Sequence, residues 1–154
     1  MIFGLVGTNS WDFTRLIKEL DMIASETDEE VVLQIGNNKI RPKYAEYFNF
    51  KSKREIEAFY KRSRVIVAHA GIGILLSAIR YKKPIIIVPR MKKYGEHFDD
   101  HQIDTAKQLE KEGITVLWDI TKLKSFLINQ NLKNYFKKNN DLIYNLKNYI
   151  KNYE

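Results

Sequence analysis

Residues 64–102, RVIVAHAGIGILLSAIRYKKPIIIVPRMKKYGEHFDDHQ, hold the pattern that decides the fold of this chain. The apolar run 65–68 is followed by two glycines, then by apolar residues at helical spacing, and then by a second apolar run, 85–88. This order predicts a strand, a glycine turn, a helix and a parallel strand, joined in a right-handed crossover. Because ligands of open parallel sheets bind outside the carboxyl ends of the strands, we expect the functional site there.

All three histidines of the chain follow the two strands of this crossover. His69 ends the first strand, whereas His97 and His101 lie in the segment after the second strand. Histidine is the side chain whose ordinary pKa allows its charge to change between pH 5 and 8. Their position therefore indicates that the polar chemistry of the protein is concentrated at the carboxyl edge of the sheet.

The rest of the chain continues the alternation of strands and helices. Ser52 and Glu55 have the spacing of a capping box, which predicts the start of a helix. The apolar patterns predict further strands at 2–6, 31–35 and 114–118, further helices at 12–25, 52–63 and 99–112, and either a short strand or a packed loop within 39–50. Five or six strands in this order predict an α/β fold, a Rossmann-like doubly wound parallel sheet, in one domain covering residues 1–120.

The composition narrows the classes of protein to which the chain can belong. With no cysteine among 154 residues, disulfides and thiolate metal sites are excluded, which is compatible with a reducing compartment. The first residues, MIFGLVGTNSWDF, have no basic flank and too short an apolar run for a signal peptide or a membrane span. We therefore expect a cytoplasmic protein whose membrane contact is only peripheral.

The net charge of +7 is concentrated in the C-terminal segment. Residues 121–154 contain seven lysines, Asp141 and Glu154, a balance of +5, which leaves +2 for residues 1–120. Apolar residues recur in this segment at helical spacing, opposite a basic face. We expect basic amphipathic helices that pack on the domain itself or on a partner. Nucleic-acid binding is not favoured, since the lysines are interleaved with a regular apolar face rather than a stacking platform.

The loop after the first strand is a candidate for ligand binding. Gly7, Thr8 and Asn9 combine a flexible backbone with hydroxyl and amide groups. Their N–H groups are suited to a polar ligand, although the same residues also suit an ordinary turn that caps the following helix. Both interpretations remain open at this level.

The glycines after His69 favour a phosphate-binding turn. Gly71, Ile72 and Gly73 only partly match a dinucleotide-binding fingerprint, because Leu76 stands where the third glycine belongs and no acidic residue follows the next strand. The general physics still applies, since a helix that starts at these glycines directs unpaired N–H groups and its positive dipole end at a diphosphate. Ser77 could add a hydroxyl group.

Metal and acyl-enzyme chemistry are not expected. His97 and His101 have i, i+4 spacing, but the segment before Asp99 is expected to be a loop, so the two rings need not share one face. The chain has no cysteine, and none of its serines lies in a nucleophile elbow. We predict neither a metal site nor a cofactor.

Taken together, these motifs resemble a known family. The sequence HAGIG at a strand end, Lys83-Pro84 before the next strand, Val88-Pro89-Arg90 after it, and EHFDDHQ resemble the nucleotide-sugar-binding half of family 28 glycosyltransferases. The opening VGTN and Gln34-Ile35-Gly36 also match. The chain is most similar to the small catalytic subunits of two-part UDP-sugar transferases of the dolichol-linked and bacterial exopolysaccharide types.

The resemblance implies a function and a set of roles. It implies the donor-binding half of a GT-B enzyme, which inverts the anomeric centre while it moves a hexose or N-acetylhexosamine from a UDP-sugar to a lipid-linked acceptor, together with a membrane-anchored partner subunit. Gly71 and Gly73 would face the diphosphate, Ser77 would occupy the ribose position, and His101 with Gln102 would contact the sugar. The alternative is a non-catalytic module that binds a nucleotide or nucleotide-sugar for regulation.

The general base is less clearly indicated. His69 and Asp12 are the candidate catalytic residues, His97 lies nearby, and the partner is a further possible source of the base. Two departures from the family pattern bear on the site and its surroundings. Ile74 stands where relatives carry threonine or serine, and Lys82 stands where they carry glycine.

Overall fold

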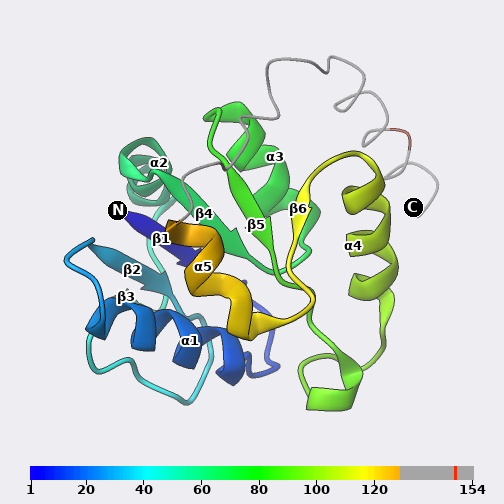
Figure 1. Ribbon diagram of the computed structural model, residues 1–154, viewed down its shortest axis with the longest axis horizontal. Coiled ribbons are helices and arrows are strands. Elements are labelled where there is room, and N and C mark those ends of the chain that lie inside the picture. Colours follow the sequence, from blue (N-terminus) through cyan, green and yellow to red (C-terminus); the bar gives the residue numbers. More distant parts are fainter. Residues whose placement is uncertain (129–147, 149–154) are drawn as a thin grey trace.

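The protein has three layers, with one parallel sheet between two layers of helices (Figure 1). The computed structural model describes residues 1–128 and residue 148. The described elements are β1 (Ile2–Leu5), α1 (Thr14–Ser25), β2 (Val31–Gln34), β3 (Glu46–Phe48), α2 (Lys53–Arg62), β4 (Val65–Ala68), α3 (Ile72–Arg80), β5 (Ile85–Ile87), the 3₁₀ helix η1 (Lys92–Tyr94), α4 (His101–Lys111), β6 (Thr115–Val116), the 3₁₀ helix η2 (Ile120–Lys122) and α5 (Leu123–Ile128).

The order of the strands confirms the doubly wound α/β fold. The sheet runs β3-β2-β1-β4-β5-β6, and every pair of neighbouring strands is parallel. The chain builds outward from β1 to β3 and then returns to place β4 on the other side of β1. This reversal puts a topological switch point between β1 and β4, where ligands of such sheets bind.

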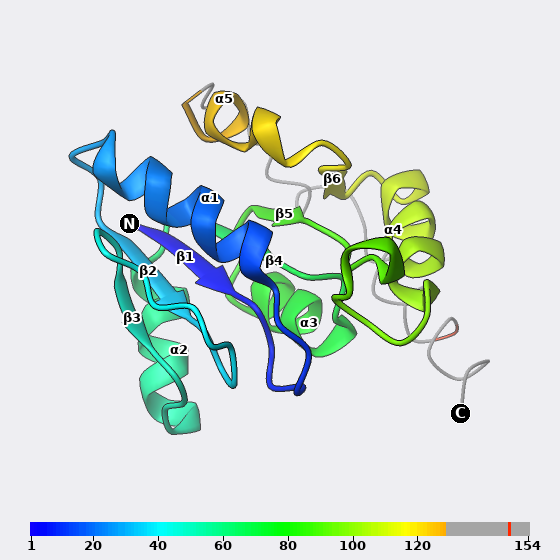
Figure 2. The same ribbon diagram turned by 90° about the horizontal axis from the view of Figure 1, so that it is seen from below.

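Alternation along the strands divides the apolar core between the two faces of the sheet. Ile2 and Val6 belong to the core under α1 and α5, whereas Phe3 and Leu5 belong to the core under α2, α3 and α4. Figure 2 shows α1 and α5 on one side of the sheet and α2 and α3 on the other. Burial of this alternating pattern fixes the strand register, because a slip of one residue would exchange the two faces.

The approach of α1 to the sheet requires a glycine in β1. A Cβ atom on Gly4 would lie 2.5 Å from Leu33 Cδ2 and 2.7 Å from Leu20 Cδ1. Gly4 therefore lets Leu20 of α1 pack directly against the β1–β2 pair.

Two helix ends are explained by local chemistry. The predicted capping box is present, because Ser52 accepts the N–H of Glu55 while the Glu55 carboxylate accepts the N–H of Ser52. At the end of α3, Lys82 adopts a φ of 53°, in the left-handed region that favours glycine. The position that departs from the family's glycine therefore carries backbone strain.

The largest boundary differences from the sequence-based expectations are at helix starts and at the sheet's edges. The helix expected from residue 12 begins at Thr14, since Asp12 accepts the N–H of Lys39 and the Asn38 side chain accepts the N–H of Phe13, which keeps both residues in the loop. The open segment 39–50 contains a short strand, β3, and the last strand is only two residues long.

The first part of the C-terminal segment packs on the domain. Leu123 and Leu127 of α5 are buried in the core under α1, and Lys124 pairs with Glu26. The apolar positions predicted further along, from Leu132 onward, lie outside the described residues.

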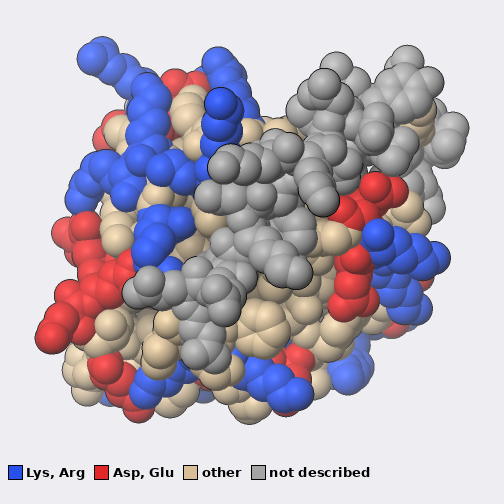
Figure 3. Space-filling view, turned by 45° about the horizontal axis from the view of Figure 1, so that its top comes forward, with Lys and Arg blue, Asp and Glu red and all other residues tan. Residues whose placement is uncertain are grey.

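Figure 3 shows blue basic and red acidic side chains side by side on the described surface, consistent with the small excess charge of residues 1–120. Within the described residues, no helix has both the length and the apolar composition needed to span a membrane.

Candidate functional site

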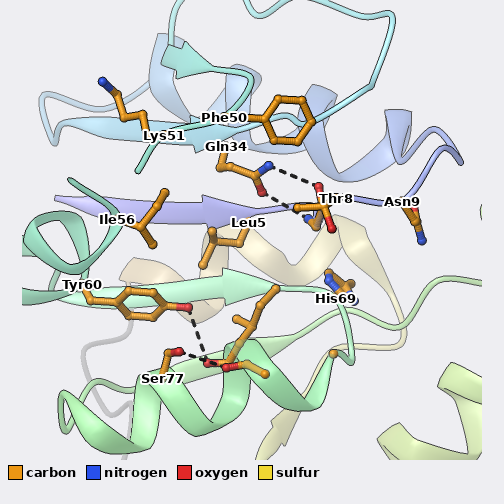
Figure 4. A pocket seen from close by; sticks show the side chains of 14 residues that line it. Leu5, Thr8, Asn9, Gln34, Phe50, Lys51, Ile56, Tyr60, His69 and Ser77 are labelled. Carbon is orange, nitrogen blue, oxygen red and sulfur yellow. Dashed lines mark hydrogen bonds between the residues drawn. The ribbon is translucent and has the colours of Figure 1, made fainter. Parts of the chain in front are cut away.

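A cavity of about 460 Å³ lies at the switch point, outside the carboxyl ends of β1, β2 and β4 (Figure 4). The lining residues come from these three strand ends, from α2 and the segment before it, and from the first turns of α3. They are Leu5, Gly7, Thr8, Asn9, Gln34, Phe50, Lys51, Ile56, Tyr60, His69, Gly71, Gly73, Ile74 and Ser77. The cavity therefore lies where the topology predicts a ligand site.

The amino end of α3 supplies hydrogen-bond donors to this cavity. Gly71 caps the helix without a side-chain hydrogen bond, and the N–H groups of Ile72, Gly73 and Ile74 have no partner among the described residues. A Cβ atom on Gly73 would meet nothing within 4 Å, so the backbone is open at this point. Free N–H groups at the positive end of a helix dipole form a site for an anion.

The His69 ring lies between two glycines at the edge of the cavity. A Cβ atom on Gly7 would lie 2.6 Å from His69 Nε2, and one on Gly71 would lie 2.3 Å from His69 Cε1. Both positions therefore need glycine to accommodate the ring, and Gly7 also has a φ of 86°. Burial, with the positive charge of Arg90 as the second cause, lowers the pKa of His69 to about 4, so the ring is neutral at physiological pH.

Gln34 holds the loop after β1 in place. Its Oε1 accepts the N–H of Gly7 at 3.2 Å, and its Nε2 donates to the carbonyl oxygen atoms of Gly7 at 3.2 Å and Asn49 at 3.0 Å. Every polar atom of this buried side chain is therefore used. As a result, Thr8 and Asn9 are positioned at the rim of the cavity.

The wall opposite the α3 turn is largely apolar. Ile56 and Tyr60 of α2 lie near Leu5, and Phe50 extends over the cavity from the segment before α2 (Figure 4). Burial raises the pKa of Tyr60 to about 12, so its hydroxyl group remains protonated. Ser77 donates to the carbonyl oxygen of Gly73 at 3.0 Å, within its own helix.

A buried charge network lies on the other side of His69, in the loop after β5. Arg90 is fully buried and donates to the carbonyl oxygen atoms of Val6, Trp11, Asp12 and Glu96. The Glu96 carboxylate pairs with Arg15 at 2.6 Å and accepts the N–H of Met91. Burial lowers the pKa of Arg90 to about 10, which still leaves the guanidinium charged at neutral pH.

The structure brings together most of the predicted site residues, but not all. The cavity is lined by Gly7, Thr8, Asn9, His69, Gly71, Gly73 and Ser77, and Ile72 is the first residue of the adjoining helix.

Besides Ile72, four of the predicted residues lie outside the lining of the cavity. Asp12 lines a second hollow, of about 420 Å³, beside Arg15 and Glu96. His97 pairs with Asp99, and His101 is exposed at the start of α4. Gln102 is within hydrogen-bond distance of His69, with its Nε2 3.3 Å from His69 Nδ1.

The residues that sequence reasoning missed are those brought in by distant segments. Gln34 carries a detectable signal, as an amide at the end of an otherwise apolar strand, because a buried polar side chain needs partners. Arg90 carries a similar signal, directly after a buried strand. Phe50 and Lys51 have none, since only the tertiary fold places them over the cavity.

Comparisons with known proteins agree with this architecture. The model of the glycosyltransferase family 28 C-terminal domain matches residues 1–152. The UDP-N-acetylglucosamine transferase subunit ALG13 of Mus musculus is 29% identical over 120 residues, which are 72% of this chain and 10% of that protein. The same subunit of Debaryomyces hansenii is 28% identical over 107 residues, which are 70% of this chain and 48% of that protein. The chain thus spans a tenth to about half of these relatives.

Solved structures show the same fold at low sequence identity. The NMR structure of ALG13 has a TM-score of 0.57 at 15% identity and covers 89% of both chains. The crystal structure of Acinetobacter baumannii MurG has a TM-score of 0.56 at 16% identity, covering 86% of this chain and 43% of that one.

Proposed function

Because this chain belongs to the C-terminal-domain group of glycosyltransferase family 28, we propose that its cavity binds a UDP-sugar and that the protein takes part in transfer of the sugar. The transferred group is a hexose or an N-acetylhexosamine, in line with the relatives named as UDP-N-acetylglucosamine transferase subunits. The observation that carries the proposal is the cavity at the switch point, with the unpartnered N–H groups of α3 at one side.

The α3 turn is suited to the diphosphate of such a donor. The N–H groups of residues 72–74 can donate hydrogen bonds to negatively charged phosphate oxygen atoms, and Gly73 leaves room for the ligand to approach the backbone. During transfer the bond from the sugar to the diphosphate breaks, and negative charge accumulates on the leaving group. Donors already directed at that position stabilise the transition state without a metal ion.

The apolar wall is suited to the nucleoside. Phe50 is 53% exposed at the edge of the cavity, and Ile56 and Leu5 line the adjoining wall. A pyrimidine base can stack on an aromatic ring while its sugar lies against apolar surface. The uridine would therefore lie toward α2, with the diphosphate toward α3.

The acceptor and the general base come from a second protein in this proposal. Relatives are named as subunits of a transferase, which supports a multi-chain enzyme. We infer a membrane-anchored partner that presents a lipid-linked sugar to a cytoplasmic, peripherally bound donor domain. Trp11, Tyr94 and Phe98 are exposed aromatic residues in the loops after β1 and β5, and Tyr94 lines the second hollow. They provide apolar surface for such a partner.

Substitution of Gly73 provides the sharpest test of donor binding. Gly73 lines the cavity, a Cβ atom there would meet nothing within 4 Å, and leucine favours a helix more than glycine does. We expect Gly73→Leu to lower the affinity for a UDP-sugar at least tenfold, measured by calorimetric titration with a panel of UDP-sugars, while the unfolding midpoint in urea does not fall.

The control is Arg80→Leu, at the exposed far end of the same helix, which should leave the affinity unchanged. Equal affinity of wild-type protein and Gly73→Leu would contradict the assigned site. Binding without transfer to a lipid-linked acceptor, even with a membrane fraction that contains the partner, would favour the non-catalytic nucleotide-binding module instead.

A further inference from the structure

Arg90, Gln102 and His69, of which only His69 lines the cavity, form a chain of hydrogen bonds. The backbone N–H of Arg90 lies 3.1 Å from Gln102 Oε1, and Gln102 Nε2 lies 3.3 Å from His69 Nδ1. The resemblance to family 28 would instead direct Gln102 at the donor sugar. In the structure both ends of its amide are occupied by the protein itself.

The direction of each hydrogen bond follows from the first member of the chain. A backbone N–H can only donate, so the Gln102 atom that faces Arg90 must be the carbonyl oxygen. The Gln102 NH₂ group therefore faces His69, and an NH₂ group can only donate. His69 Nδ1 must accept, and a neutral imidazole that accepts at Nδ1 carries its proton on Nε2.

The first member of this chain is held rigidly. The Arg90 guanidinium donates to four backbone carbonyl groups, which fixes the position of this residue. Gln102 is the second residue of α4, so its backbone is held by the helix. The opposite edge of the His69 ring, with Nε2, faces the backbone of Gly7 beside the cavity.

We propose that Gln102 is a positioning residue that fixes His69 as the Nε2–H tautomer, so that His69 presents a hydrogen-bond donor to the cavity. In this state His69 has no free lone pair on the cavity side and cannot accept a proton from an acceptor hydroxyl group. His69 therefore acts in ligand orientation, and the general base of the reaction lies elsewhere. Only the identity of the ligand rests on the proposed function, because the tautomer is set by protein groups alone.

His97 provides an internal contrast for this assignment. Its Nδ1 lies 2.9 Å from the Asp99 carboxylate, which can only accept a hydrogen bond when ionised. The backbone N–H of Asp99 also approaches His97 Nδ1, but at the longer distance of 3.4 Å. Because the contact with the carboxylate is the shorter one, we expect His97 to carry a proton on Nδ1. The two histidines should show opposite states at Nδ1 in the same sample.

Nitrogen NMR of the full chain tests the proposal without added ligand. In ¹⁵N-histidine-labelled protein near pH 7, two-bond and three-bond correlation spectra should show the Nε2–H tautomer for His69 and a protonated Nδ1 for His97. Resonances are assigned with His97→Gln and His101→Gln. An Nδ1–H tautomer for His69 in the wild-type protein would overturn the proposal.

An isosteric variant tests whether Gln102 sets the tautomer. In Gln102→Glu one carboxylate oxygen can still accept from Arg90, while the other can only accept from His69, so the proton should be found on Nδ1. Gln108→Glu, on the same helix and outside this chain of hydrogen bonds, is the matched control and should leave His69 unchanged. A His69 signal that stays in the Nε2–H form in Gln102→Glu would contradict the positioning role.

A further titration separates this proposal from the proposed function. Addition of UDP should shift the His69 Nε2 resonance if the cavity binds the diphosphate. If the tautomer is as stated but UDP causes neither this shift nor heat in calorimetry, donor binding fails while the role of Gln102 stands. If UDP binds but His69 carries its proton on Nδ1, the role of Gln102 fails while donor binding stands.

Discussion

The two sides of His69 use polar groups in opposite ways. On the α3 side, the N–H groups of residues 72–74 have no partner among the described residues and border a cavity. On the β5 side, Arg90, Glu96 and Arg15 are bound to one another and to backbone carbonyl groups in a buried network. The α3 side therefore has donors available to a ligand, whereas the charged groups on the β5 side hold the loops in place.

This difference shows why charge alone is a poor guide to the site. The charged residues near the carboxyl edge are conspicuous in the sequence, yet most of their hydrogen bonds and ion pairs are formed with other groups of the protein. The groups available to a ligand are mainly backbone amides, which leave no mark in the sequence except the glycines around them. Three substitutions test this difference between the two sides of His69.

The largest effect is expected from Arg90→Met. Removal of the guanidinium leaves the carbonyl groups of Val6, Trp11, Asp12 and Glu96 without their donor, so the free energy of unfolding should fall by about 3–5 kcal/mol. Urea unfolding monitored by circular dichroism measures this change. Arg62→Met is the matched control, because its ion pair with Glu30 is exposed and should contribute less than about 1 kcal/mol. Equal losses in the two variants would refute the distinction between buried and exposed charge.

An intermediate effect is expected from His69, which borders both regions. Its pKa in the folded protein is about 4, against an ordinary value of 6.5, so below pH 6.5 the unfolded chain takes up a proton that the folded chain excludes. The free energy of unfolding should therefore decrease as the pH falls from 6.5 toward 4.

His69→Gln removes this dependence, whereas the carboxylates titrate in both proteins. Between pH 7 and pH 5 the variant should lose about 2 kcal/mol less stability than the wild-type protein. Urea unfolding at the two pH values measures the difference. Parallel pH profiles for the two proteins would mean that His69 titrates normally and is open to water.

The smallest effect is expected from Gln34→Leu, on the cavity side. The substitution removes the hydrogen bonds to Gly7 and Asn49, but Gly7 borders the cavity, so water can replace part of what is lost. We expect a loss of about 1 kcal/mol in urea unfolding. A loss as large as that of Arg90→Met would show that the loop after β1 is as closed as the loop after β5.

The sequence was informative where local rules dominate. Apolar runs located the strands, the Ser52 to Glu55 spacing located the start of α2, and Gly71 with Gly73 located the open turn of α3. These features depend on residues close together in the chain.

The sequence was less informative where distant segments meet. The Asn38 side chain reaches across from another loop and delays the start of α1, and Phe50 reaches the cavity only because β3 pairs with β2. The role of Gln102 is of the same kind, since its amide is oriented by Arg90, 12 residues away. Such contacts between distant segments leave no periodic pattern of residue types in the sequence, so they become visible only in the folded structure.

The strained backbone of Lys82 gives the molecule a position for second-site suppression. It lies beyond the end of α3 that is remote from the Gly71 cap, and it has a left-handed conformation that glycine adopts at little cost. Replacement of this lysine by glycine should recover about 0.5–1 kcal/mol, the difference between the relieved strain and the added freedom of the unfolded chain. Damaging variants at the carboxyl edge could then be studied in this background at a nearly constant folded fraction, with no atom of the cavity altered.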